Sequence, residues 1–174
     1  MNRIIKVAFA LIGLVMAPGL HAITLVDKLD EPRGFCVDTV GFEIRAKPEE
    51  GLQTHSCYSY QGQLAVAQAF DTDLIPKEIF QIIAFNLRMT ARAPSTGSAF
   101  ALEPCNGRAT QEFERRPNGK IVLLAAPGNC VTVCQGPSRH GGGNPVHLIR
   151  TLTLKLCESS SDNRQLWRLR AFAD

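Results

Sequence analysis

Short stretches of alternating apolar and polar residues run along this chain, and turn-forming residues separate them. Ile23 to Val26 alternates in this way, and Phe35 to Asp38 and Lys120 to Leu124 are further short strand-like segments. Turn signals such as Glu31-Pro32-Arg33-Gly34 and Asn118-Gly119 lie between them, as is typical of strands joined by tight turns. No stretch sustains the 3.6-residue period of an amphipathic helix. The pattern therefore predicts an all-β domain.

A glutamine two residues before a large aromatic occurs three times. The copies are Gln68-Ala69-Phe70, Gln111-Glu112-Phe113 and Gln165-Leu166-Trp167, and their glutamines are 43 and 54 residues apart. Side chains two apart share one face of a strand, so the aromatic can fill a core while the amide hydrogen-bonds a neighbouring loop. The repetition predicts three units, approximately 23–71, 72–114 and 115–174, with Phe70, Phe113 and Trp167 in the core.

The second unit has the least regular pattern. Ile79 to Ile83 and Phe85 to Met89 fit strands, but Asp73 to Ile83 also fits a short helix with Asp73 as its cap and Pro76 in its first turn. Both alternatives stay open at this stage.

The first 22 residues have the composition of a secretory signal peptide. Arg3 and Lys6 precede an apolar run from Val7 to Met16, and a small residue, Ala22, ends the segment. We expect cleavage after Ala22 and a secreted or periplasmic domain over 23–174. The apolar run is too short for a confident membrane span, and no later stretch is long and apolar enough to be one.

Net charge and cysteine content bear on the kind of partner and on the compartment of the protein. Without Arg3 and Lys6, 17 basic residues face 16 acidic ones, so general electrostatic attraction for nucleic acid is not supported. The chain has six cysteines, all beyond the expected cleavage site, and an even number in an exported chain favours disulfides.

The order of these motifs resembles the ricin-type (R-type) β-trefoil lectins. Their repeats run from a Cys-Leu-Asp-like strand, through a Gly-rich strand and a second Cys, to Gln-x-Trp. The first unit matches with Cys36-Val37-Asp38, then Gly51 to Cys57, then Gln68-Ala69-Phe70. In the second unit, Asn86 takes the place of the first Cys and Arg88 that of the Asp. The resemblance covers essentially the whole mature chain and implies a β-trefoil of three degenerate repeats.

In the third unit, Asn144 to Ile149 looks like the Gly-x-Pro-Val-Gln-Leu-Trp strand of these lectins. An excess of residues, Arg150 to Leu156, then precedes Cys157. The register of this last hairpin is therefore open.

The resemblance also implies how the cysteines pair. Cys36 with Cys57, and Cys130 with Cys157, occupy the two Cys positions of their repeats. Cys105 and Cys134 are left over, and we expect them to bond across repeats. The competing interpretation is a metal site formed by Cys130, Cys134, His140 and His147; an oxidising compartment disfavours it, and we expect neither metal nor cofactor.

For a sugar site, the resemblance implies a hydroxyl acceptor, an amide and a flat ring on which the sugar can stack. The first repeat offers Asp38 as acceptor, Gln53 as amide and His55 as platform, with Gln68 bracing Asp38 from behind. Tyr58 and Tyr60 are alternative platforms.

The match to a lectin site is incomplete. Ala67 stands where family sites usually have an Asn, and Thr132, Arg164 and either Lys155 or Ile149 occupy the site positions of the third repeat. At most the first repeat looks competent. The alternative is that Asp38, Gln68 and the tyrosines only support the scaffold.

Enzyme motifs are missing from the sequence. His140-Gly141-Gly142-Gly143 is similar to an oxyanion loop, but no G-x-S-x-G elbow accompanies it, and there is no P-loop, dinucleotide fingerprint or H-E-x-x-H. We predict a non-catalytic, carbohydrate-binding protein whose partner is a glycan or glycoconjugate.

Two other functions remain in consideration. Gly34-Phe35-Cys36 and Leu102-Glu103-Pro104-Cys105 are similar to segments of the lectin-like accessory subunits of cytolethal distending toxins, which would imply an enzymatic protein partner. The other is a trefoil protease inhibitor that presents Arg115-Arg116-Pro117.

Overall fold

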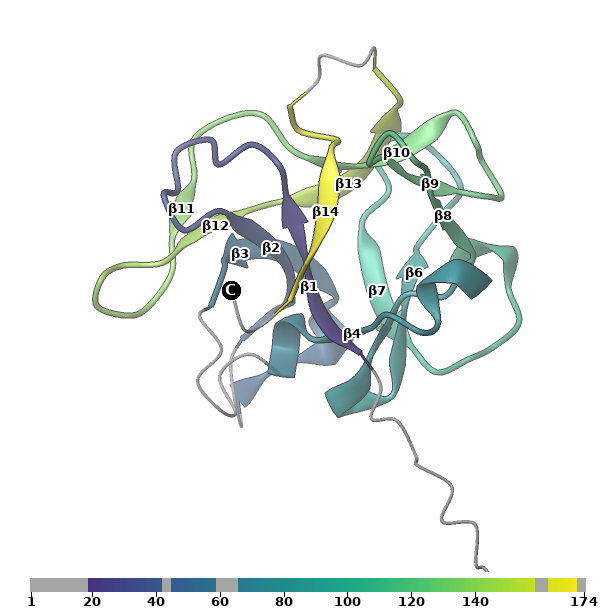
Figure 1. The fold of residues 1–174 in the computed structure, drawn as a ribbon, viewed down its shortest axis with the longest axis horizontal. Coiled ribbons are helices and arrows are strands. Elements are labelled where there is room, and N and C mark those ends of the chain that lie inside the picture. Colours follow the sequence, from purple (N-terminus) through teal and green to yellow (C-terminus); the bar gives the residue numbers. More distant parts are fainter. Residues whose placement is uncertain (1–18, 42–44, 59–65, 159–162, 172–174) are drawn as a thin grey trace, which may run out of the picture.

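The computed structural model describes residues 19–41, 45–58, 66–158 and 163–171. Within these ranges the chain consists of β-strands and short 3-10 turns, without any α-helix. In Figure 1, β1 (Leu20–Leu25) and β14 (Trp167–Ala171) lie side by side near the middle of the molecule. The predicted all-β class is confirmed. None of the described segments forms a helix long and apolar enough to cross a membrane.

Two antiparallel sheets account for the strands. The larger follows the order β11-β12-β3-β2-β1-β4-β5-β6-β7, with β14 added beside β1, and the smaller follows β13-β10-β9-β8. The remaining strands of the larger sheet are β2 (Phe35–Thr39), β3 (Leu52–Ser56), β4 (Phe70–Asp71), β5 (Gln81–Ile82), β6 (Leu87–Ala91), β7 (Phe100–Glu103), β11 (Arg139–His140) and β12 (Leu148–Arg150). Those of the smaller sheet are β8 (Phe113–Arg115), β9 (Ile121–Leu123), β10 (Asn129–Val133) and β13 (Leu152–Leu156).

Short 3-10 turns connect some of the described strands. They are η2 (Pro48–Glu50), η4 (Ile75–Lys77), η5 (Ile83–Phe85) and η6 (Ala109–Gln111). Asp73 to Ile83 is therefore neither a continuous helix nor mainly strand. Pro76 lies in the first turn of η4, and only Gln81–Ile82 of the expected strand is extended.

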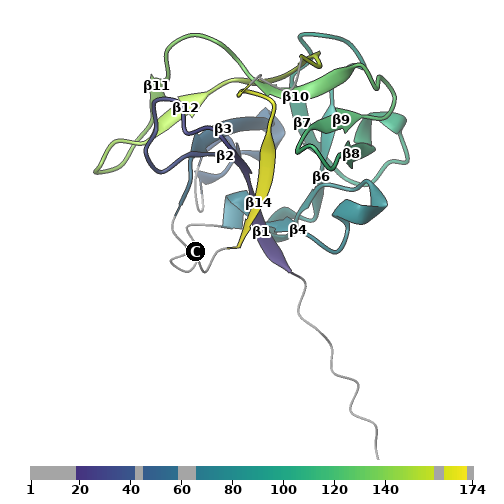
Figure 2. The ribbon, with the colours of Figure 1, turned by 45° about the horizontal axis from the view of Figure 1, so that its top comes forward.

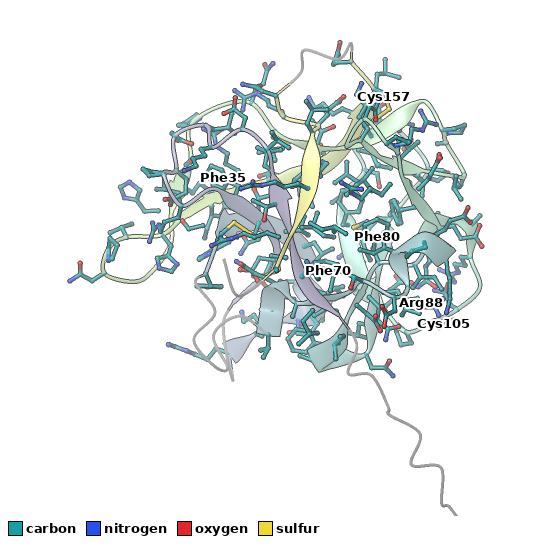
Figure 3. The ribbon with its side chains drawn as sticks, in the orientation of Figure 1. Phe35, Phe70, Phe80, Arg88, Cys105 and Cys157 are labelled. Carbon is teal, nitrogen blue, oxygen red and sulfur yellow. A yellow bond between two sulfur atoms is a disulfide. The ribbon has the colours of Figure 1, made fainter. Side chains whose placement is uncertain are left out.

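The aromatic that ends each repeat lies in one shared core. Phe70 and Phe113 are fully buried and Trp167 nearly so, as predicted. The Trp167 indole Nε1 donates a hydrogen bond to the Val131 carbonyl at 2.9 Å, so its only polar atom is satisfied. Figure 3 shows Phe70 near the centre of the molecule with Phe80, which is also fully buried.

The glutamine that precedes each aromatic makes the same three hydrogen bonds in every repeat. Gln68 Nε2 donates to Asp38 Oδ2 at 2.9 Å and to the Ser56 carbonyl at 3.2 Å, while its Oε1 accepts from the Tyr58 amide at 3.1 Å. The corresponding partners are Thr90, Pro104 and Asn106 for Gln111, and Thr132, Leu156 and Glu158 for Gln165. We call this pattern the glutamine brace; it relates the three repeats atom by atom.

The brace corrects the expected register of the second repeat. Thr90, not Arg88, occupies the position of Asp38, because its hydroxyl accepts from Gln111. Arg88, not Asn86, occupies the position of Cys36, since it lies opposite Glu103 as Cys36 lies opposite His55. Asn86 instead adopts a left-handed conformation at the end of η5, with φ of 53°.

Two of the three expected disulfides are formed. Cys36 bonds to Cys57, and Cys130 bonds to Cys157. With Cys130 in a disulfide, the four-ligand metal alternative is excluded.

The third expected disulfide is wrong, because Cys105 and Cys134 are both free. Cys105 is exposed beyond β7, on the same side of the molecule as Arg88 in Figure 3. Cys134 follows β10, where its amide bonds to the Thr151 carbonyl and its Sγ lies 3.4 Å from Thr153 Oγ1. Each cysteine keeps the position that its own repeat gives it, and the two do not form a disulfide.

The third repeat contains an extra hairpin, and this resolves the open register. β13 pairs with β10, so that Lys155 lies opposite Cys130 and takes the position of His55. Leu148–Arg150 is therefore not the strand of the third repeat that the resemblance suggested. It forms β12, which pairs with β11 and with β3 of the first repeat. In Figures 1 and 2 this hairpin extends from one side of the molecule.

The expected signal-peptide cleavage site lies within β1. Leu20, His21 and Ala22 pair with β4 or β14, while Ile23, Thr24 and Leu25 pair with β14 and β2. Cleavage after Ala22 would shorten β1 but leave the pairs of Ile23, Thr24 and Leu25 in place. The cleavage itself remains a prediction.

Candidate functional site

Asp38, the expected hydroxyl acceptor, lies in the middle of β2 with no exposed surface. Its neighbours are the Gln68 amide and, 3.7 Å from Oδ2, the His55 Nδ1. Burial raises the pKa of Asp38 to about 7, although hydrogen bonds from Gln68 and from the Thr39 backbone oppose this shift. The carboxyl group is therefore a buried support that titrates near neutral pH.

His55, the expected platform, lies on β3 directly over Asp38. Only 7% of its surface is exposed, and burial lowers the pKa of its imidazole to about 4, helped by the neighbouring His147 and Arg33. Its Nδ1 lies 3.0 Å from the Ser56 carbonyl. We assign the proton of the neutral ring to Nδ1, because a carbonyl can only accept.

Two further rings pack on His55. The Tyr58 ring centroid lies 5.1 Å from that of His55, the His147 centroid lies 4.9 Å from it, and the Tyr58 and His147 centroids are 5.3 Å apart. Tyr58 and His147 are half-buried. We call these three side chains the ring cluster. From the interior outwards, the order is the Asp38–Gln68 pair, His55, and then Tyr58 with His147.

An ion pair between the half-buried Arg33 and the buried Glu31 borders the ring cluster. Glu31 is 2% exposed and accepts hydrogen bonds from Arg33 Nε at 2.8 Å and Arg33 Nη2 at 2.7 Å. Burial alone would raise the pKa of Glu31, but the bonds from Arg33 and from the Ser56 hydroxyl lower it to about 2. The pair is therefore ionised at every physiological pH and fixes Ser56 beside His55.

The remaining predicted site residues are less favourably placed. Gln53 is 9% exposed, and its amide donates to the Thr39 carbonyl at 3.3 Å, within the hairpin. Tyr60 lies outside the described residues. The sequence interpretation did not include His147 in this site, because it belongs to an insertion of the third repeat. The only sequence signal for it was the excess of residues before Cys157.

The other two repeats lack rings at the matching positions. His55 corresponds to Glu103 in the second repeat and Lys155 in the third, and Tyr58 corresponds to Asn106 and Glu158. The braces there end on the hydroxyls of Thr90 and Thr132 rather than on a carboxylate. Within the described part of the chain, only the first repeat combines a braced carboxylate with aromatic surface.

Comparison with solved structures identifies the fold. The C-terminal domain of an earthworm lectin, solved as a mutant in complex with 6'-sialyllactose, matches with a TM-score of 0.61 and 14% identity over 88% of this chain and 99% of the lectin domain. The β-trefoil lectin of the Vibrio vulnificus hemolysin, solved with N-acetyl-D-lactosamine, matches with a TM-score of 0.58 and 14% identity over 89% and 96%. No protein-family profile and no curated sequence matches the chain.

A third similar structure comes from a toxin complex. A chain of the Haemophilus ducreyi cytolethal distending toxin matches with a TM-score of 0.58 and 14% identity, over 88% of this chain and 83% of the toxin chain. The protein is thus a β-trefoil. Its fold is that of the ricin B-type lectins and of a cytolethal distending toxin subunit, as the sequence resemblance implied.

Proposed function

We propose that this protein is a non-catalytic carbohydrate-binding module with one glycan site, in the first repeat. The observation that carries the proposal is the ring cluster, layered over the Asp38–Gln68 pair. Half-buried rings offer flat apolar surface to the C–H face of a sugar, and neutral imidazoles can exchange hydrogen bonds with its hydroxyls. Two disulfides fit the oxidising compartment in which such a module would act.

In this proposal the buried and exposed residues have different roles. Tyr58 contacts the sugar, and the small accessible edges of the largely buried His55 and Gln53 supply polar contacts. Asp38 and Gln68 act from below, by holding His55 and the Tyr58 backbone in place. One shallow site of this kind should bind in about the millimolar to high-micromolar range.

A glycan array probed with the secreted protein tests the proposal, followed by titration of the best glycan. We expect Tyr58→Ala and Asp38→Ala each to weaken binding by at least about tenfold, which corresponds to about 1.4 kcal/mol. Thr132→Ala is the matched control, because Thr132 holds the position of Asp38 in the third repeat. Asp38→Asn, which keeps an acceptor for Gln68, guards against loss of folding.

The outcomes are distinct. Absence of any glycan signal for the folded wild-type protein would overturn the proposal. Binding that survives in Tyr58→Ala and Asp38→Ala but fails in Thr132→Ala would move the site to the third repeat.

A second candidate function is that of an accessory subunit that holds an enzymatic toxin chain. The similarity to the Haemophilus ducreyi toxin chain favours it, together with Gly34-Phe35-Cys36 and Leu102-Glu103-Pro104-Cys105. Co-purification of the protein from its host, followed by mass spectrometry, should then recover an enzymatic partner chain in stoichiometric amount. Recovery of the protein alone would exclude it.

A further inference from the structure

The extra hairpin of the third repeat is fixed to the first repeat along the edge of β3. In the ladder between β12 and β3, Ile149 lies opposite His55 and Arg150 opposite Thr54. The Thr54 hydroxyl donates to the Arg150 carbonyl at 3.0 Å. The hairpin therefore extends the very strand that carries the expected platform, although it comes almost a hundred residues later in the chain.

Side chains fix the hairpin at three further points. Ser56 Oγ accepts from the Leu148 amide at 2.7 Å, and Arg33 Nη2 donates to the Val146 carbonyl at 2.6 Å. Arg150, which is only 7% exposed, donates to Asp30 Oδ1 from Nη2 at 2.9 Å. Charge-assisted hydrogen bonds of this kind are among the stronger ones. The hairpin is thus a fixed wall beside the ring cluster rather than a loose loop.

The glycine run at the tip of the hairpin lets His147 reach the ring cluster. Gly143 has φ of +95°, and a Cβ there would lie 2.9 Å from His147 Cδ2. At Gly141, a Cβ would lie 3.5 Å from His55 Nε2. At Gly142 a Cβ would meet nothing within 4 Å. The backbone thus approaches both imidazoles, in ordinary contact distance of His55 at position 141 and so closely at position 143 that a side chain there would crowd His147.

His147 has the properties of a ligand-contacting ring. It is half-buried and lies against both His55 and Tyr58. Burial lowers the pKa of His147, and the positive charge of Arg33 adds to this effect. The neutral ring that results has one donor and one acceptor nitrogen as well as a flat face. Together, Tyr58 and His147 make two tilted surfaces, 49° apart, on the outer side of His55.

We propose that the β11–β12 hairpin of the third repeat forms one wall of the glycan site of the first repeat, and that His147 is a specificity-determining residue for the sugar held there. This inference rests on the proposed function. The sugar lies across the outer surface that rings of two repeats form together, Tyr58 of the first and His147 of the third. The wall is already in place before binding, so little conformational entropy is lost when the sugar arrives.

A pair of histidine variants tests the role of the ring. His147→Ala should change the order of preferred glycans on the array and weaken the best one by at least about tenfold. His140→Ala is the matched control, because His140 lies on β11 of the same hairpin and is exposed. His147→Phe restores the flat face without the nitrogens. Partial recovery of affinity with altered preference is the expected result, since a merely structural histidine would affect all glycans equally.

A pair of glycine variants tests the position of the ring without changing its chemistry. Gly143→Ala should reproduce the effect of His147→Ala, because alanine strains the backbone at a φ of +95° and its methyl group would meet the imidazole, so that the ring is displaced. Gly142→Ala should bind like the wild type. Thermal unfolding of each variant verifies that the domain remains folded.

Failure of this inference can be told apart from failure of the proposed function. If the wild type binds a glycan and Tyr58→Ala loses it, but His147→Ala and Gly143→Ala keep wild-type affinity and preference, the wall has no part in recognition and this inference falls alone. If the folded wild type binds no glycan, both fall together.

Discussion

At the scale of single residues, the most consequential pair is Asp38 and His55. Burial shifts the pKa of the acid up, to about 7, and that of the imidazole down, to about 4. Between these values the folded protein carries one proton on the pair. The unfolded chain also carries one between about pH 4 and 6.5, on the histidine. Because the folded and unfolded states hold the same number of protons, the pair contributes little pH dependence to stability in this range.

Asp38→Asn should make the free energy of unfolding depend on pH more steeply than that of the wild type does. In this variant the folded state has no proton on His55 above about pH 4, whereas unfolded histidine keeps one up to about 6.5. Stability should therefore rise with pH across this window, relative to the wild type, by up to about 1.4 kcal/mol per pH unit. Urea unfolding at pH 4.5, 5.5 and 6.5 measures it.

The comparison with the wild type removes other contributions. His147, whose pKa is also lowered, favours the folded state as pH rises in both proteins, so only the difference between them is interpreted. Parallel stability curves would show that Asp38 is already ionised when folded at pH 5, and would contradict the assignment.

At the scale of structural elements, the glutamine brace organises each repeat. A single buried amide links the middle of one strand, the end of the next, and the residue after the second cysteine position. Backbone groups at these turns have no strand partner, so the side chain supplies one. The brace therefore belongs to the scaffold, and it persists in the two repeats that have lost the ring cluster.

Gln111→Leu should test the brace away from the proposed glycan site. It leaves the Asn106 amide, the Pro104 carbonyl and the Thr90 hydroxyl without their partner. We expect the free energy of unfolding to fall by about 2–3 kcal/mol while glycan binding persists. Glu112→Gln, at the exposed neighbouring position, should change stability by less than about 0.5 kcal/mol. Equal stability of the two variants in urea would show that the brace is dispensable.

Sequence reasoning succeeded where the signal repeats and failed where it does not. The glutamine-aromatic endings and the paired cysteines gave the three units and two disulfides. In the second repeat no cysteine anchors the first strand, so Asn86 and Arg88 were placed two positions from their true register. The burial of Asp38 depends on His55 above it and on an insertion far along the chain. Local pattern carries no information about such a contact, and His147 was missed for the same reason.

At the scale of the whole molecule, two of the six cysteines remain reduced in an otherwise disulfide-bonded domain. A free thiol that is exposed reacts faster than one that is partly covered. The number of thiols that react, and the order in which they react, therefore test which cysteines the fold leaves unpaired.

Alkylation of the native, unreduced protein should label two cysteines. Cys105, which is exposed, should react first, and Cys134, which is half-buried, more slowly. Cys36, Cys57, Cys130 and Cys157 should react only after reduction. Intact-mass and peptide mass spectrometry distinguish the steps. A peptide that joins Cys105 to Cys134 would instead restore the cross-repeat disulfide that the fold does not form.

The brace has one further implication, for engineering. Thr90 and Thr132 already accept a hydrogen bond from the glutamine amide, as Asp38 does. An aspartate at either position would therefore find its glutamine partner already in place. The next substitutions would place aromatic side chains at Glu103 or Lys155, the positions that correspond to His55. The number of glycan sites per molecule could then be chosen. A protein with two or three occupied repeats gains avidity because its sites are tethered in one chain.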